Sequence, residues 1–235
     1  ATCCDMLICV LFSLFRFLSE LVKVDLSHNH IMSITEGAFQ HQGKLKELKL
    51  DNNKIGQITN KTFFKLAQME FVSLRGNEVT EMPPNVFEHS KKLQKVDFAR
   101  NRISKVHPNA FKGLKAIRIL HLEDNWLQSV PSDSFKDLSN LAELYLSGNP
   151  FTNTIAPDSF SSLRSLTFLD LSSCRLKKLE GTSLRGLVTL RRLRLEDNNF
   201  SRVPTEAFLI IPILHDLLIG SNPFTTISIC TYMKF

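Results

Sequence analysis

The sequence predicts an α/β solenoid, in which successive repeats form an arc with a parallel β-sheet on the concave face and a mostly irregular or short-helical convex side. Three features of the 235 residues predict this fold class. Apolar residues recur with a fixed period, and one asparagine and one phenylalanine recur in the same places of nearly every repeat. Self-similarity at a period of about 20 to 50 residues is typical of stacked, quasi-one-dimensional folds.

The repeat unit is 24 residues long, except for one unit of 25 residues between Leu141 and Leu166. The extra residue of that unit lies in the segment 151–155. Inside a unit the spacing also holds, as in Ile117-x-x-Leu120-x-Leu122-x-x-Asn125 of the fifth unit. The units open at Leu21, Leu45, Met69, Leu93, Ile117, Leu141, Leu166, Leu190 and Leu214.

The Leu-x-Leu part of each unit alternates with period two, which predicts a short strand with one buried face. Strands of successive units then add side by side into a parallel sheet, at about 4.8 Å per unit. Because no single unit can bury its own apolar face, the stability of the solenoid depends on contacts between neighbouring units.

An asparagine follows each predicted strand, where the chain turns and leaves backbone groups unpaired in the interior. A carboxamide both donates and accepts hydrogen bonds, so it can satisfy these groups unit after unit. Cys174 replaces the asparagine in the seventh unit, and we interpret it as structural and not as a reactive thiol. The predicted ladder comprises Asn29, Asn53, Asn77, Asn101, Asn125, Asn149, Asn198 and Asn222.

An aromatic column falls where the chain returns along the convex side. Stacked rings there would form a spine that holds the back of the solenoid open and forces the curvature. We assign these rings a core role and no binding role. The column comprises Phe39, Phe63, Phe87, Phe111, Phe135, Phe160, Leu184, Phe208 and, at its end, Tyr232.

This pattern resembles the "typical" leucine-rich repeats of animal extracellular proteins, which include Slit-like guidance proteins, the acid-labile-subunit type, neuronal adhesion receptors and Toll-like receptors. The 24-residue period and the phenylalanine column carry the resemblance, which covers roughly residues 21–227. The segments 146–151 and 168–174 are similar to stretches of Toll-like receptor ectodomains. The resemblance implies an extracellular or cell-surface location.

The ends of the chain depart from the family. Secreted members usually carry cysteine-rich caps, but Cys3, Cys4 and Cys9 lack the usual spacing, and only Cys230 lies near the other end. We therefore expect a fragment without caps, attached to a membrane only through a missing flanking segment. Residues 1–20 are interpreted as a degraded first coil or a targeting remnant, and residues 21–235 as about nine repeats, the last one truncated.

Side chains between the buried leucines should point out of the concave sheet, where most units present charged or small residues. The fifth to seventh units instead present an apolar patch near the middle of the sheet. An aromatic anchor with a polar rim is the usual anatomy of an interaction hot spot. The predicted binding patch comprises Ile119, His121, Tyr145 and Phe168, flanked by Glu123, Asp124 and Glu143.

The net charge is +6 and the isoelectric point about 9.1, which favours anionic partners. A basic lateral stripe just after the asparagine column is a candidate for heparan sulfate, although ordinary solubilising charge explains it as well. We expect no nucleic-acid partner, because no block of five like charges and no nucleic-acid motif occurs. The stripe comprises Lys54, Arg102, Lys105, Arg175, Lys178 and Arg202.

Two triplets, at Asn60 and Asn199, match the N-glycosylation acceptor pattern and should lie outside the strands. The sequence contains no catalytic, nucleotide-binding or metal-ligand motif, so we expect neither an enzyme nor a cofactor or metal site. We also expect Asp97 and Asp170, which lie on the predicted sheet in different units, to be solvated surface charges.

The predicted function is a protein-interaction module of a secreted or cell-surface receptor or adhesion protein, which binds a protein ligand or co-receptor through its concave sheet. Two alternatives remain open. One is a fragment of a Toll-like innate-immune receptor ectodomain that dimerises around a microbial ligand. The other is an extracellular-matrix protein that binds glycans or collagen.

Overall fold

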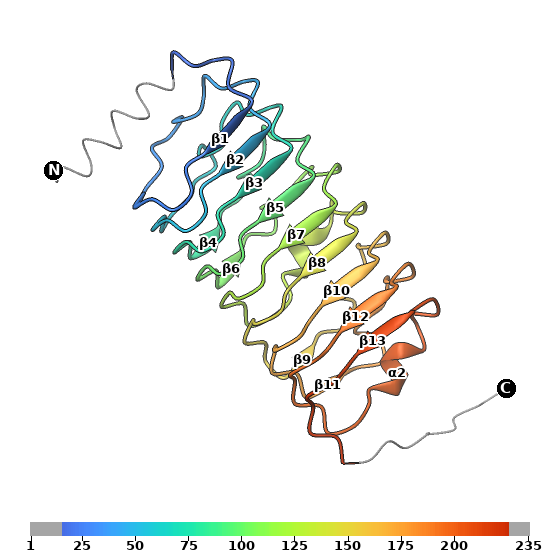
Figure 1. Cartoon of the computed structure of the whole chain (residues 1–235). Helices are drawn as coiled ribbons and strands as arrows, with labels where there is room; N and C mark the ends of the chain where they lie inside the picture. Colours follow the sequence, from blue (N-terminus) through green and yellow to red (C-terminus); the bar gives the residue numbers. More distant parts are fainter. Residues whose placement is uncertain (1–15, 226–235) are drawn as a thin grey trace.

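The computed structural model describes residues 16–225, which form one arc of stacked coils with a nine-stranded parallel sheet along its concave face (Figure 1). Each sequence unit forms one coil and contributes one three-residue strand, so the predicted solenoid is confirmed. The strands of the sheet, in spatial order, are β1 (Lys23–Asp25), β2 (Glu47–Lys49), β3 (Phe71–Ser73), β5 (Lys95–Asp97), β7 (Ile119–His121), β8 (Glu143–Tyr145), β10 (Phe168–Asp170), β12 (Arg192–Arg194) and β13 (Asp216–Leu218).

The strands pair in strict register, so equivalent residues of successive coils lie beside each other. Leu120 of β7 pairs with Leu144 of β8, and Leu144 pairs with Leu169 of β10. These central residues are completely buried, whereas the residues on either side of them are partly exposed, as the period of two predicts, with the exception of the buried Asp170. The extra residue near 151–155 leaves this register intact, because the chain accommodates it after the strand has ended.

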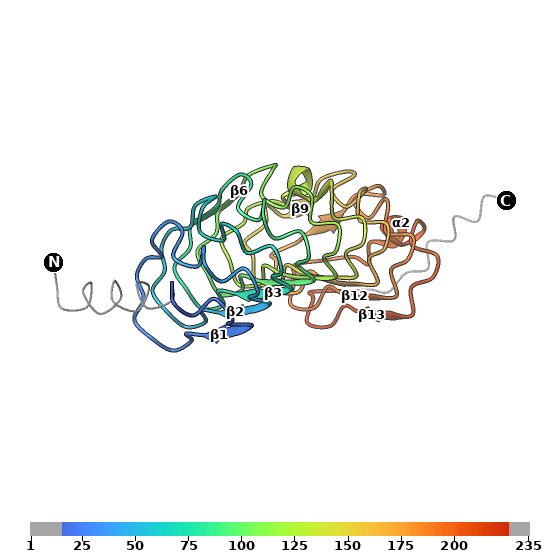
Figure 2. The same ribbon diagram turned by 90° about the horizontal axis from the view of Figure 1, so that it is seen from above.

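The convex side contains short parallel strand pairs that the sequence analysis did not predict (Figure 2). There β4 (Glu81–Met82) pairs with β6 (Lys105–Val106), and β9 (Thr154–Ile155) pairs with β11 (Lys178–Leu179). The short helices that were predicted are present as η1 (Ser132–Phe135) and α2 (Thr205–Phe208). Each follows a Val-Pro dipeptide. The fixed φ of that proline, −78° at Pro131, favours the start of a helix there over continuation of the extended strand.

The ladder asparagines from Asn53 to Asn222 hydrogen-bond to the backbone of their own coil and of the preceding coil, as Asn125 illustrates. The Asn125 Oδ1 atom accepts a hydrogen bond from the Ile103 amide at 2.9 Å. Its Nδ2 atom donates to the Phe98 carbonyl at 2.9 Å and to the Leu122 carbonyl at 3.1 Å. Asn29 donates only within its own coil and is exposed. The ladder therefore ties each coil to the preceding one through buried backbone groups.

Cys174 continues the ladder with weaker bonds. Its Sγ atom lies 3.3 Å from the carbonyl oxygens of both Leu146 and Ser172, which share its single hydrogen, and it offers no amide oxygen. The Phe151 amide donates instead to the nearby Asn149 carbonyl at 2.9 Å. Burial raises the pKa of the Cys174 thiol to about 12, so the group stays neutral, in agreement with a structural role.

The phenylalanine spine is buried inside the arc, behind the sheet. The rings of Phe63 and Phe87 stack with centroids 5.4 Å apart, and the rings of Phe111 and Phe135 lie 6.5 Å apart. Phe208 is only partly buried in the last coil, and Tyr232 lies outside the described residues. Among residues 16–225, no helix is long and apolar enough to cross a membrane.

A left-handed residue follows every strand of the concave sheet, three positions after the last strand residue and one position before the residue of the asparagine ladder. Examples are Asn52, with φ of 53°, and Asp124, with φ of 54°. Asparagine and aspartate tolerate this conformation better than most residues, and glycine adopts it without strain. The repeated turn sends the chain out of the sheet in the same direction each time, which keeps the ladder residues aligned.

Candidate binding surface on the concave sheet

The strands β7, β8 and β10 bring four predicted patch residues together near the middle of the concave face. Ile119 and His121 of β7 lie opposite Glu143 and Tyr145 of β8. Phe168 of β10 lies opposite Glu143. All of these side chains are partly exposed. Strands of only three residues hold them, so their spacing is set by the backbone pairing and not by mobile loops.

Three aromatic rings form a continuous ladder across these strands. The imidazole of His121 stacks on the phenol ring of Tyr145 with centroids 4.2 Å apart and an interplanar angle of 14°. The Phe168 ring follows at 5.0 Å from Tyr145, tilted by 46°. Packed in this way, the rings lose little additional conformational freedom when a ligand covers them.

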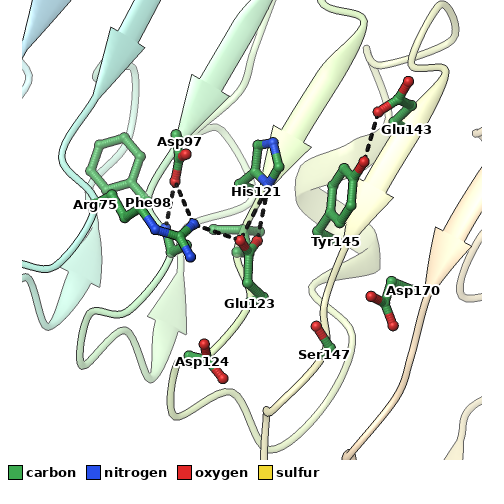
Figure 3. A network of polar contacts seen from close by, with 12 residues as sticks. Arg75, Asp97, Phe98, His121, Glu123, Asp124, Glu143, Tyr145, Ser147 and Asp170 are labelled. Atoms are coloured by element: carbon green, nitrogen blue, oxygen red, sulfur yellow. Dashed lines mark hydrogen bonds and ion pairs between the residues drawn. The ribbon is translucent and has the colours of Figure 1, made fainter. Parts of the chain in front are cut away.

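Polar contacts border the ladder on the side of the earlier coils and at the start of β8 (Figure 3). Arg75 Nη1 lies 2.8 Å from Glu123 Oε1, and His121 Nδ1 lies 3.1 Å from Glu123 Oε2. Tyr145 donates its hydroxyl hydrogen to Glu143 Oε2 at 2.8 Å. Two of the predicted flanking carboxylates therefore orient the aromatic side chains directly.

Arg75 is the member of this network that the sequence analysis missed. It lies two coils before Glu123, in the same column of the sheet, with Ala99 between them. A small, buried alanine leaves room for the arginine to cross the intervening coil. The sequence does contain a signal for this pair. The basic and the acidic residue are 48 positions apart, which is two units, and a small residue lies halfway between them.

The environment stabilises defined protonation states in the network. Burial opposes ionisation of Glu123, but the hydrogen bonds from His121 and Arg75 outweigh it and lower the pKa of that carboxyl. Burial and the bond to Glu143 raise the pKa of Tyr145 to about 12. The phenol therefore remains a neutral donor.

The expectation that Asp97 and Asp170 are solvated surface charges is wrong. Both residues are buried, with 8% and 4% of their surface exposed. Asp97 Oδ1 accepts a hydrogen bond from the Ala99 amide, and Asp170 Oδ1 accepts from the Ser172 amide, both at 3.0 Å. An aspartate at the end of a strand can bond to the backbone two residues on, so these side chains bend inwards and close the turn. Burial also raises the pKa of Asp97.

Asp124, the remaining predicted flanking residue, lies apart from the network (Figure 3). Its side chain is about half exposed, and Oδ2 lies 3.5 Å from Arg100 Nε. Because Asp124 occupies the left-handed turn after β7, its side chain does not point over the aromatic ladder.

A hollow of about 580 Å³ adjoins the ladder on the side of the later coils. Tyr145 and Phe168 line one part of it, and the other part is basic and was not predicted. Arg192 lies 2.8 Å from Asp216, and Arg194 lies 3.3 Å from Asp170. The full lining is Glu143, Tyr145, Thr167, Phe168, Arg191, Arg192, Arg194, His215 and Asp216.

The six residues of the predicted basic stripe are all exposed on the side where the strands end. Carboxylates lie among them. Arg102 is paired with Glu78 at 3.2 Å, and Lys178 is paired with Glu180 at 2.6 Å. Lys105 and Lys178 belong to the short convex strands β6 and β11, so the stripe curves towards the back of the solenoid.

The two glycosylation triplets lie outside the concave sheet, as expected. Asn60 and Asn199 are exposed, so each could carry a glycan on the folded chain. Within residues 16–225, no three histidine, cysteine or carboxylate side chains are grouped so that they could hold a metal ion.

The repeats match the family profile described as "Leucine rich repeat" over residues 19–79, 72–127 and 117–176. No curated protein sequence matches the chain. The structure of Drosophila Toll in complex with Spatzle is similar, with a TM-score of 0.78, 24% identity, and coverage of 90% of this chain and 28% of Toll.

Two further solved structures show the same fold. Mouse RP105 in its complex with MD-1 has a TM-score of 0.72 and 24% identity, over 81% of this chain and 32% of that chain. TLR13 in its complex with ssRNA13 has a TM-score of 0.69 and 23% identity, over 90% of this chain and 38% of that chain. The chain thus spans less than two fifths of the length of each of these three structures, which share its curved stack of coils.

Proposed function

Because the chain belongs to the leucine-rich repeat family, we propose that it is the ligand-binding part of a secreted or cell-surface receptor or adhesion protein, and that it holds a protein ligand on the concave patch. Leucine-rich repeats are an interaction fold and not a catalytic one. The proposed contact residues are Ile119, His121, Tyr145 and Phe168, with Glu123 and Glu143 as orienting groups and Asp124 at the rim.

One observation carries the proposal, namely the continuous, partly exposed ladder of His121, Tyr145 and Phe168 on the concave sheet. Aromatic side chains supply large contact areas with few rotatable bonds, and they are enriched among residues that dominate binding energy. Elsewhere on the concave face, most outward side chains are charged, and several are paired across strands, as Lys23 is with Glu47 and Arg192 is with Asp216. The ladder is therefore the part of the sheet best suited to become buried.

The polar network supports the same role. A ligand that covers the ladder finds Glu123 and Glu143 already bonded to protein donors, so it does not have to desolvate free carboxylates. Arg75 and Glu123 hold His121 in place before the ligand arrives. Preorganisation of this kind improves affinity by reducing the entropy lost on binding.

The experiment requires a ligand, which a screen of this chain against a library of secreted and cell-surface proteins can supply. Its dissociation constant is then measured for the wild type and for the double variant Tyr145→Ala and Phe168→Ala. We expect the double variant to lose at least about tenfold in affinity, since each hot-spot aromatic typically contributes more than about 1 kcal/mol.

Phe71→Ala provides the matched control. Phe71 occupies the same place in its unit as Phe168, is also partly exposed, and lies between Lys49 and Lys95 away from the patch. We expect it to bind like the wild type. A double variant that keeps the affinity of the wild type, or a control that weakens binding equally, would contradict the assignment.

A second candidate function is a fragment of a Toll-like innate-immune receptor ectodomain. The structural similarity to Toll favours it, although an identity of 24% supports the shared fold alone. For this candidate we expect the ligand to bring two copies of the chain together, which sedimentation velocity with and without the ligand measures. A complex with a single copy of the chain would favour the adhesion or guidance role.

A further inference from the structure

The carboxylate of Glu143 differs from the other carboxylates of the described concave face, because neither a cation nor a backbone amide contacts it. Glu143 is the first residue of β8 and is partly exposed. Within the described chain, its side chain forms one hydrogen bond, in which the neutral Tyr145 hydroxyl donates to Oε2 at 2.8 Å (Figure 3). This bond orients the carboxylate, but it does not neutralise the charge.

The comparison covers the outward positions of all nine units, which are the two outer residues of each strand and the residue two positions later. Glu47 lies 3.1 Å from Lys23, and Glu123 lies 2.8 Å from Arg75. A cation also lies against Asp97, Asp170, Glu196 and Asp216. The two that remain, Asp25 and Asp51, each accept a hydrogen bond from a backbone amide. Glu143 is therefore the one outward carboxylate of the described sheet without such compensation.

The neighbours of Glu143 explain why it has no cation. Ile119 lies opposite it on one side, and Phe168 lies opposite it on the other. The Arg118 carbonyl accepts the Glu143 amide at 2.9 Å, but the Arg118 guanidinium donates to the Asn140 carbonyl at 3.0 Å. The sheet thus presents a charged group between two apolar side chains.

The arginines that line the hollow beyond Phe168 do not neutralise Glu143 either. Two of the three already contact carboxylates, as described above. The third, Arg191, forms no ion pair in the described chain, and its backbone lies two coils from that of Glu143. By the strand spacing this is about 10 Å, a distance at which exposed charges are largely screened at physiological salt.

The surroundings of the Tyr145 ring are negative. Burial and the bond to Glu143 are the largest causes of the raised pKa of Tyr145. The charges of Glu143, Glu123 and Asp170 raise that pKa further. Because the phenol gives its hydrogen to Glu143, its oxygen remains available as an acceptor. An aromatic ring beside a carboxylate attracts a cation through its π-face as well as through the charge.

We propose that the concave patch receives an arginine side chain of the protein ligand, with the guanidinium bound to Glu143 and packed against the Tyr145 ring. The inference rests on the proposed function, since it names a group that the ligand presents there. A guanidinium is planar, donates two parallel hydrogen bonds to a carboxylate and stacks on aromatic rings. A ligand that covers Glu143 without a cation buries an uncompensated charge, which weakens its binding. Glu143 therefore selects among ligands in addition to orienting Tyr145.

The test uses N-acetyl-arginine amide as a probe, because the protein ligand is not identified. N-acetyl-citrulline amide is the neutral control, with nearly the same shape and no charge. Binding to the full chain is followed by nuclear magnetic resonance of isotope-labelled tyrosine rings. The chain contains two tyrosines, Tyr145 and Tyr232, and the variant Tyr145→Phe identifies the signal of the patch.

Two variants with the same change in net charge are compared. Glu143→Gln removes the charge and keeps an oxygen that can accept the Tyr145 hydroxyl. Glu47→Gln is the matched control, since Glu47 occupies the same place in its unit and is paired with Lys23 and Lys49. Far-ultraviolet circular dichroism of each variant checks that the fold is retained.

We expect the arginine probe to shift the Tyr145 signal saturably, with dissociation constants for the wild type and Glu47→Gln within about twofold of each other. The dissociation constant should rise about tenfold in Glu143→Gln, and the citrulline probe should bind about tenfold more weakly than the arginine probe. No saturable shift, equal binding of the two probes, or unchanged binding in Glu143→Gln would overturn the proposal. Tighter binding of N-acetyl-lysine amide would overturn the choice of a guanidinium.

Failure of this inference can be told apart from failure of the proposed function. If the protein ligand loses affinity in the Tyr145 and Phe168 double variant while the arginine probe shows no preference, the proposed function stands and the arginine assignment is wrong. If the probe binds as expected while the protein ligand keeps its affinity in the double variant, the cation site stands and the proposed function is wrong.

Discussion

Removing one member of the asparagine ladder tests what holds neighbouring coils together. In Asn125→Ala, the Ile103 amide loses its acceptor, because only Asn125 Oδ1 receives its hydrogen. The Phe98 and Leu122 carbonyls each keep a second partner, since Asn101 also donates to Phe98 and Asn149 also donates to Leu122. Because successive asparagines donate to the same carbonyls, the substitution leaves neither carbonyl without a hydrogen-bond donor, and the loss of stability is smaller.

The magnitude follows from these three groups. A buried amide left without an acceptor costs about 1 to 3 kcal/mol, and each of the two other lost bonds contributes about 0.5 to 1.5 kcal/mol. We expect Asn125→Ala to lower the free energy of unfolding by about 3 kcal/mol. Asn29→Ala should lower it by less than about 1 kcal/mol, because Asn29 is exposed and bonds only within its own coil.

Urea-induced unfolding, followed by circular dichroism at equilibrium, measures both variants. The stability of the solenoid depends on contacts between neighbouring coils, so the slope of the unfolding transition is compared as well as its midpoint. A loss in Asn125→Ala no greater than the loss in Asn29→Ala would refute the reasoning. It would mean that water replaces the carboxamide and that the ladder is not a main source of stability.

Three further predictions concern single residues. The pKa of Glu123 is below its ordinary value of 4.5 in the folded state, so its charge contributes stability above that value, and the contribution disappears as the pH falls through the folded pKa. Arg75→Gln should therefore reduce the loss of stability on acidification, as measured by urea unfolding at several pH values. Cys174 is buried and its pKa is raised to about 12, so mass spectrometry should find it unalkylated until the chain is unfolded. Gly148→Ala should lower the melting temperature, because φ is +70° and the new Cβ would press on Asp124, whereas Gly56→Ala, with open space around it, should not.

The repeat period allowed most of the fold to be predicted before any coordinates were known. In a solenoid every unit meets a copy of itself, so Leu120 packs against Leu144 and Asn125 bonds to the coil before it for reasons visible within 24 residues. The contact of His121, Tyr145 and Phe168 followed from the same register. Because the units repeat, contacts between coils can be predicted from the spacing of residues within a single unit.

Other features of the concave face could not be predicted in this way. They depend on side chains that reach past the adjacent coil or that bond to the backbone and do not face the solvent. The bond between Arg75 and Glu123 needs the small Ala99 between them, and Asp97 bends back to the Ala99 amide and does not face the solvent. None of these follows from the average unit, because each depends on one residue that differs from the repeat.

The amino-acid sequence alone determined the repeat length, the strand register, the asparagine ladder and the location of the aromatic patch, because these follow from spacing that every unit shares. Only the tertiary structure decided which charges neutralise one another. Ion pairs form between side chains of different coils and depend on reach and direction, so Arg102 meets Glu78 while Arg164 meets no carboxylate in the described chain.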